Sequence, residues 1–145
     1  MNYLSTFAIS ASGMTVEKAR LDVTAMNLAN VHSTRTADGN AFVPMQVISG
    51  AKQGASFASY LSAAGVQSAG AKVFEVRARN GAPRMVYEPG HPDADGKGFV
   101  AYPGVDPVGE MVNLISAMRA YEANVAALNA AKTMALKALE LGGSA

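Results

Sequence analysis

The residues with the most evident chemical potential in this chain are two histidines and a short acidic turn. His32 and His91 are the only histidines, and Asp93-Ala94-Asp95-Gly96 is similar to the middle of an EF-hand calcium loop. Such a loop would carry an acidic ligand in place of His91 and a glutamate in place of Tyr102. We therefore interpret the segment as a tight polar turn and His32 as a solvated loop residue.

Signatures of catalysis are missing from the rest of the sequence. There is no cysteine, no HExxH zinc motif, no Gly-rich phosphate loop and no G-x-S-x-G elbow. The acidic residues are scattered, so the sequence indicates no carboxylate pair such as a peptidoglycan-cleaving enzyme needs. We predict that the protein is not an enzyme and has no catalytic residues, no cofactor, no metal and no small-molecule substrate.

The charge distribution also excludes classes of partner. The chain has 12 basic and 11 acidic residues, a net charge of +1 and no run of either sign, which argues against nucleic acid and anionic membrane surfaces. No stretch is apolar enough to predict a membrane span. The first charged residue is Glu17, so the opening stretch lacks the basic region of a cleaved signal peptide. Export, if it occurs, is expected to proceed without such a leader.

Two long helices are predicted at the ends of the chain, because all six prolines lie between Pro44 and Pro107. The flanking segments carry apolar residues spaced alternately by three and four, the pattern of a coiled-coil seam. The fold class is therefore mainly α, with the two helices paired as an antiparallel coiled-coil-like hairpin. The predicted seam within one subunit consists of Leu4, Phe7, Met14, Leu21 and Leu28 on the first helix and Met111, Leu114, Met118, Tyr121, Val125 and Leu128 on the second.

The ends of both helices carry recognisable signals. The first helix is expected to begin between Asn2 and Ser5 and to end near Asn30, with Asn27 and Asn30 forming a helix-end motif. Asp106 is placed to cap the second helix, and Pro107 fits its first position. Residues 1–30 and 108–141 are thus predicted to form one core domain.

The middle of the chain, 31–107, is predicted to be a loop and β-hairpin insertion. A short strand is expected over 42–48, and the composition of 49–70, mostly Ala, Ser and Gly, indicates a segment that is mobile or ordered only against a partner. Strands over 72–79 and 84–88 flank Asn80-Gly81, a strong hairpin signal. Turn residues fill 89–98.

A second stripe on the C-terminal helix is rich in alanine and lies about 100° from the seam. Either this helix is simply rich in a good helix former, or the stripe packs against neighbouring subunits, as in a tube or filament. Few charged residues occur between 108 and 141, which favours the second interpretation. The predicted packing surface between subunits consists of Ala117, Ala120, Asn124, Ala127 and Ala131.

Several segments resemble those of the FlgC family of proximal rod proteins, within the flagellar rod and hook axial proteins. They are Ser10-Ala11-Ser12-Gly13-Met14, Ala25-Met26-Asn27-Leu28-Ala29-Asn30, the stretch from His91 to Pro103, and Arg119-Ala120-Tyr121-Glu122-Ala123-Asn124. The Asn-Leu-Ala-Asn segment is shared across the whole group, whereas the stretch from His91 to Pro103 together with the last segment is typical of the proximal rod.

The resemblance implies a structural subunit of the periplasmic drive shaft that polymerises through its terminal helices and transmits torque. Implied partners are copies of itself, other rod proteins, the MS-ring region and the flagellar type III export apparatus. From the residues alone, a stand-alone coiled-coil adaptor that forms a closed oligomer is the alternative, since it would use the same seams.

Overall fold

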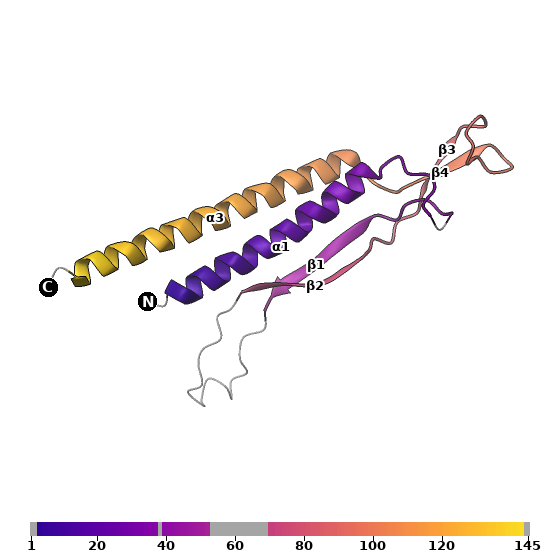
Figure 1. Ribbon diagram of the computed structural model, residues 1–145. Coiled ribbons are helices and arrows are strands. Elements are labelled where there is room, and N and C mark those ends of the chain that lie inside the picture. The colour runs from indigo at the N-terminus through magenta and orange to yellow at the C-terminus, as the bar shows by residue number, and fades with distance from the viewer. Residues whose placement is uncertain (1–2, 38, 53–69, 144–145) are drawn as a thin grey trace, which may run out of the picture. The chain divides into compact units, whose positions relative to one another are not determined.

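The computed structural model describes residues 3–37, 39–52 and 70–143. Two long helices, α1 (Tyr3–Ala29) and α3 (Pro107–Gly143), flank four short strands (Figure 1). The strands are β1 (Met45–Ala51), β2 (Ala71–Ala78), β3 (Arg84–Tyr87) and β4 (Phe99–Tyr102). The predicted mainly α class is confirmed. Most of the Ala/Ser/Gly segment predicted over 49–70 lies outside the described residues.

The end of α1 and the start of α3 lie where their sequence signals predict. At the end of α1 the Asn30 side-chain amide donates a hydrogen bond to the Met26 carbonyl at 2.9 Å, which satisfies a carbonyl of the last turn. At the start of α3 the Asp106 carboxylate accepts a hydrogen bond from the Val108 amide at 3.1 Å. Asp106 therefore caps the helix and Pro107 occupies its first position, as expected.

Removal of the Asp106 cap is expected to lower the free energy of unfolding by about 1 kcal/mol. Asp106→Ala leaves the Val108 amide without its partner, whereas Asp106→Asn keeps an acceptor oxygen at the same place. Urea unfolding followed by circular dichroism measures the difference. Equal midpoints for the alanine variant, the asparagine control and the unaltered protein would contradict the capping role.

The predicted hairpin between 72–79 and 84–88 is wrong, although both strands exist. Strand β2 pairs with β1, and β3 pairs with β4. The Arg79 amide donates to the Pro44 carbonyl at 2.7 Å, so β2 continues alongside β1 beyond its last residue. An Asn-Gly turn of the favoured type needs a positive φ at the glycine, and among the described glycines only Gly39 and Gly98 have one.

The observed hairpin instead joins β3 to β4, a strand that the sequence reading missed. The strands are antiparallel, with Val86 opposite Val100, which is fully buried. The acidic turn lies between them: the Asp95 carboxylate accepts hydrogen bonds from the amides of Lys97 and Phe99 at 2.8 and 2.9 Å, and Gly98 takes a φ of 80°. Asp95 therefore stabilises the loop of this hairpin through backbone hydrogen bonds, as a polar turn.

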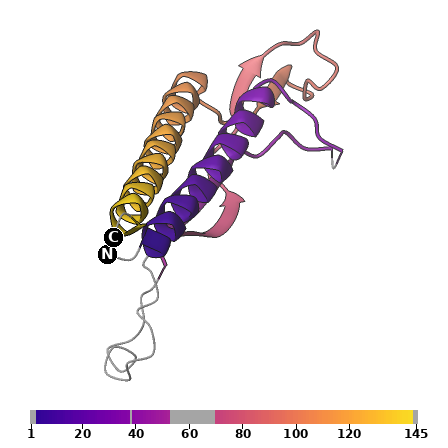
Figure 2. The same ribbon diagram turned by 60° about the vertical axis from the view of Figure 1, so that its left-hand side comes forward.

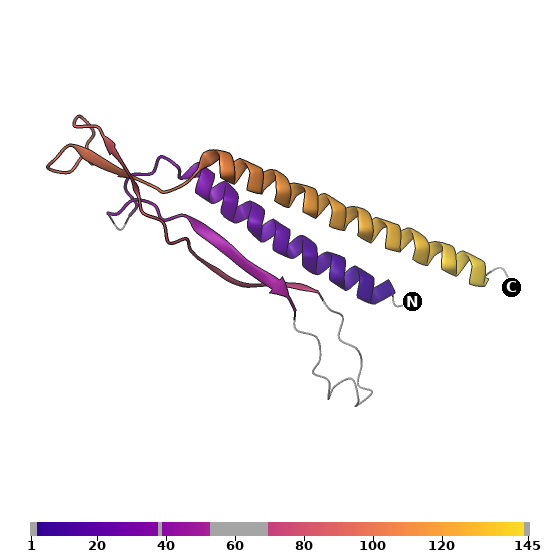
Figure 3. The ribbon, with the colours of Figure 1, turned by 180° about the vertical axis from the view of Figure 1, so that it is seen from behind.

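The chain divides into two compact units. Unit 1 comprises Met1–Ala19, Ser49–Phe74 and Ala117–Ala145, and unit 2 comprises Arg20–Ile48 and Glu75–Ser116. Each unit contains a part of both helices and of the β1–β2 pair. Within each unit, α1 lies between α3 and its part of the β1–β2 pair, as the turned views show (Figures 2 and 3).

Candidate functional site

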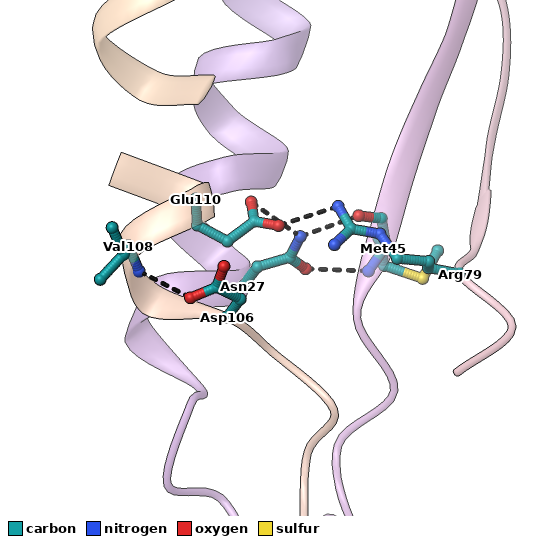
Figure 4. A network of polar contacts seen from close by, with 6 residues as sticks. All are labelled: Asn27, Met45, Arg79, Asp106, Val108 and Glu110. Carbon is teal, nitrogen blue, oxygen red and sulfur yellow. Dashed lines mark hydrogen bonds and ion pairs between the residues drawn. The ribbon is translucent and has the colours of Figure 1, made fainter. Parts of the chain in front are cut away.

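A buried asparagine near the end of α1 holds the first residue of β1 in unit 2. Asn27 is only 1% exposed. Its side-chain nitrogen donates to the Met45 carbonyl at 2.8 Å, and its side-chain oxygen accepts from the Met45 amide, also at 2.8 Å (Figure 4). The amide group thus pairs with the backbone as a neighbouring strand would. Of the two asparagines predicted to form a helix-end motif, Asn27 binds the strand, whereas the Asn30 side chain bonds a carbonyl of the last turn of α1.

A buried carboxylate in the first turn of α3 lies beside this asparagine. Glu110 is 2% exposed, and its Oε1 accepts a hydrogen bond from Arg79 Nη2 at 2.8 Å. Its Oε2 is 3.4 Å from the side-chain nitrogen of Asn27. A buried carboxylate is costly unless it is paired and hydrogen-bonded, so Arg79 compensates the charge of Glu110 (Figure 4). No local sequence signal marks Glu110, which lies two helical turns before Ala117 and shares its buried face of α3.

In unit 1 the two helices lie close together at Gly13. A Cβ atom added there would lie 2.7 Å from Asn124 Oδ1 and 2.9 Å from Asn124 Cγ. On the same face of α3, Ala117 and Ala131 are 4% and 1% exposed. Small side chains on this face and a glycine on α1 therefore allow the backbones to come together.

The position of the alanine stripe corrects the predicted packing surface. Ala117 and Ala131 are buried within the chain, so they cannot contact a neighbouring subunit in this conformation. Ala120 and Asn124 are half-buried and Ala127 is exposed. The buried alanines are covered by other parts of the same chain.

The predicted seam of large side chains is only partly covered by the chain itself. Leu4, Met111, Met118 and Tyr121 are between 37% and 78% exposed. The other members are half-buried, namely Phe7, Met14, Leu21, Leu28, Leu114, Val125 and Leu128, and the seam within one subunit stays a prediction. The most buried residues of α3, Glu110, Ala117 and Ala131, lie beside this seam on the helix surface.

An exposed apolar stripe lies on the first turns of α3, in unit 2. Val108, Met111, Val112 and Ile115 are between 51% and 70% exposed and form the α3 apolar stripe. Their spacing places them on one side of the helix, turned away from the buried Glu110. No charged residue occurs between Met111 and Met118. A contiguous exposed apolar face of this kind is typical of a protein interaction surface.

The titratable residues near the β3–β4 hairpin make structural contacts with one another in unit 2. The Tyr102 hydroxyl donates to Glu88 Oε2 at 3.0 Å, and this hydrogen bond to a carboxylate raises the pKa of the Tyr102 hydroxyl. His32 and His91 each make an edge contact with the Tyr102 ring, with centroids 6.4 Å apart. His32, interpreted from the sequence as solvated, is exposed and has this one aromatic neighbour.

Asp93 of the acidic turn makes structural contacts with the loop that follows α1. It accepts a hydrogen bond from the Thr34 hydroxyl at 2.8 Å and pairs with Arg35 Nε at 2.9 Å. Over residues 3–37, 39–52 and 70–143, no group of three or more His, Asp or Glu could hold a metal ion. Nor does any described helix combine the length and the apolarity that a membrane span needs.

Comparison with known proteins gives consistent results over the whole chain. Residues 97–141 match the family model described as the C-terminal part of the flagellar basal body rod proteins FlgE, FlgF and FlgG. The chain is 43% identical to the flagellar basal-body rod protein FlgC of Escherichia coli O6:H1, over 98% of this chain and 99% of that one. It is 41% identical to the protein of that name from Bacillus subtilis, over the same shares, and 34% identical to that from Borreliella burgdorferi, over 97% and 98%.

Paired terminal helices with an exposed apolar face, together with these matches, define a structural protein of the flagellar rod class. Within that class, the identity over nearly the full length of each relative shows that the chain belongs to the FlgC family of flagellar basal-body rod proteins.

Proposed function

We propose that this protein polymerises through its terminal helices into the proximal rod and that the α3 apolar stripe is a contact between subunits. One observation carries the proposal: four large apolar side chains are more than half exposed on a helix face without charges. Burying each of them is worth about 1.5 to 3 kcal/mol, enough to make association favourable when several act together. The half-buried Ala120 and Asn124 and the exposed Ala127 are further candidates for contact with neighbours.

In this proposal the subunit is part of a shaft that crosses the periplasm and transmits torque. Its partners are copies of itself, other rod proteins and the MS-ring region, and it reaches them through the flagellar type III export apparatus. Helices 1–30 and 108–141 act as the rod-core domain, with 31–107 as an insertion. Membership of a family of rod components supports this function over a closed coiled-coil adaptor.

Two charges placed on the α3 apolar stripe are expected to abolish rod assembly. Val112→Glu with Ile115→Lys leaves the net charge unchanged and adds an ion pair at a spacing that favours helix, so the subunit itself should stay helical. A strain that lacks its own protein of this family is complemented with the variant, and swimming and rods in isolated basal bodies are scored. We expect normal expression and export but no rods.

The matched control carries the same pair of charges on the same turns, away from the stripe. Asn113→Glu with Ser116→Lys alters two exposed polar residues, and we expect these cells to swim. If the stripe variant also swims and builds rods, the stripe is not a subunit interface.

A further inference from the structure

We propose that Asn27, Arg79 and Glu110 form a register lock. By this we mean that they select one alignment of the end of α1, the start of α3 and the β1–β2 pair, and that the Arg79–Glu110 ion pair adds little net stability. The inference goes beyond polymerisation, because it concerns how the two helix ends and the strands of unit 2 are aligned before any neighbour binds.

The buried Arg79–Glu110 pair is expected to contribute little net free energy to folding. Glu110 is almost completely buried, and its partner Arg79 is about one-third exposed. Transferring such a pair from water to the protein interior often costs as much free energy as the attraction between the two charges provides. Well-packed apolar residues of similar volume frequently give equal stability. Stability alone therefore gives no reason to place a carboxylate on the buried face of α3. Specifying a single register is the best-supported use of a buried polar group.

The apolar side chains of the predicted seam in unit 2 do not select one register of the helices. The half-buried residues of unit 2 on the predicted seam, Leu21, Leu28 and Leu114, are all leucine. Leu21 and Leu28 are two helical turns apart, so a slide of about 11 Å would put one leucine of α1 in the place of the other. The same slide would take Asn27 away from Met45 and Glu110, so the polar contacts discriminate where the apolar ones do not.

The network also fixes the register of the β1–β2 pair relative to the helices of unit 2. Asn27 bonds both the amide and the carbonyl of Met45, and a slip of β1 by one residue would break both bonds and turn every side chain to the opposite face. The backbone amide of Arg79 is bonded to Pro44, so its guanidinium is held by the strand pair when it reaches Glu110. Four segments of unit 2 are thus tied at one point (Figure 4).

Two sets of variants test the lock in the complemented strain and in the purified subunit. Arg79→Met leaves Glu110 buried without its counter-charge, and we expect loss of swimming and of rods. Arg79→Met with Glu110→Gln removes the charge while keeping the shape and the hydrogen bond to Asn27, and we expect rods to return in part. If the double variant assembles no better than Arg79→Met, charge compensation between the two residues is not what matters.

The decisive variant replaces only the buried ion pair by apolar residues, Arg79→Met with Glu110→Leu, and keeps Asn27 bonded to Met45. We expect a helical subunit that melts at or above the temperature of the unaltered protein, gives more than one set of amide resonances for unit 2, and builds no rods. Normal rods with a single set of resonances would overturn the lock. A variant that fails to fold would overturn it too, since the ion pair would then supply the stability itself. Failure of the unaltered protein to complement would count against the proposed function instead.

Discussion

Gly13→Leu is expected to be expressed at a normal level but to build no rods, because the helices of unit 1 have no room for a side chain at this position. Even a single Cβ would lie 2.7 Å from Asn124 Oδ1, closer than such contacts occur. Asn124 is itself held, since its side-chain nitrogen donates to the Ala120 carbonyl at 2.9 Å. Overpacking typically costs about 1 to 3 kcal/mol, more than the roughly 1 kcal/mol of helix propensity that a leucine adds.

Thermal unfolding of the purified subunit and electron microscopy of basal bodies measure the two consequences. A second change, Asn124→Ala, should relieve most of the clash of Gly13→Ala and let the helix benefit from the added alanine. Gly142→Leu is the control, because no atom lies within 4 Å of a Cβ built there. Wild-type melting and normal rods for Gly13→Leu would show that the helices do not approach as closely as described.

Asn27→Ala is expected to lower the free energy of unfolding by about 2 to 4 kcal/mol, the other large effect. The substitution removes both partners of Met45, and each buried polar group left unsatisfied costs about 1 to 3 kcal/mol. It also leaves a cavity at a position that is almost completely buried. Faster hydrogen exchange at the Met45 amide, which bonds to the Asn27 side chain, is the local sign of this loss.

Asn30→Ala is the matched control on the same helix. It removes two hydrogen bonds, one that Asn30 donates to the Met26 carbonyl and one that it accepts from the Ser33 hydroxyl, and is expected to cost about 1 to 2 kcal/mol. Asn27→Asp distinguishes the two halves of the contact, because it keeps the acceptor for the Met45 amide, loses the donor and adds a second carboxylate next to Glu110. Equal stability of Asn27→Ala and Asn30→Ala would show that the paired bonds to Met45 contribute little.

Much of the fold follows from local rules that the sequence displays directly. Proline disrupts a helix interior, so the proline-free ends were predicted to be the helices. Asn30 marks the end of the first helix, and Asp106-Pro107 marks the start of the second. These signals depend on a few neighbouring residues. The class of protein could also be predicted from the sequence, because the segments that resemble the FlgC family lie in the two helices and in the stretch from the acidic turn through β4.

Strand pairing was beyond the reach of local signals. Asn80-Gly81 favours a hairpin by itself, yet β2 gains more from β1, and Arg79 bonds Pro44 across a long stretch of sequence. Pairing depends on which strand is near in space, and a two-residue turn signal is too weak to decide it.

The sequence by itself determined two long helices, a small β region between them and the absence of any catalytic signature. Only the tertiary structure decided which residues of α3 are most buried, since the series through Met118 and the neighbouring series through Ala117 have equally regular spacings. The physical reason is that Gly13 meets Asn124 of α3 and Arg79 meets the buried Glu110, and these contacts favour one rotation of the helix over another. Both depend on residues far apart in the chain, and the large side chains left outside form the surface proposed to join one subunit to the next.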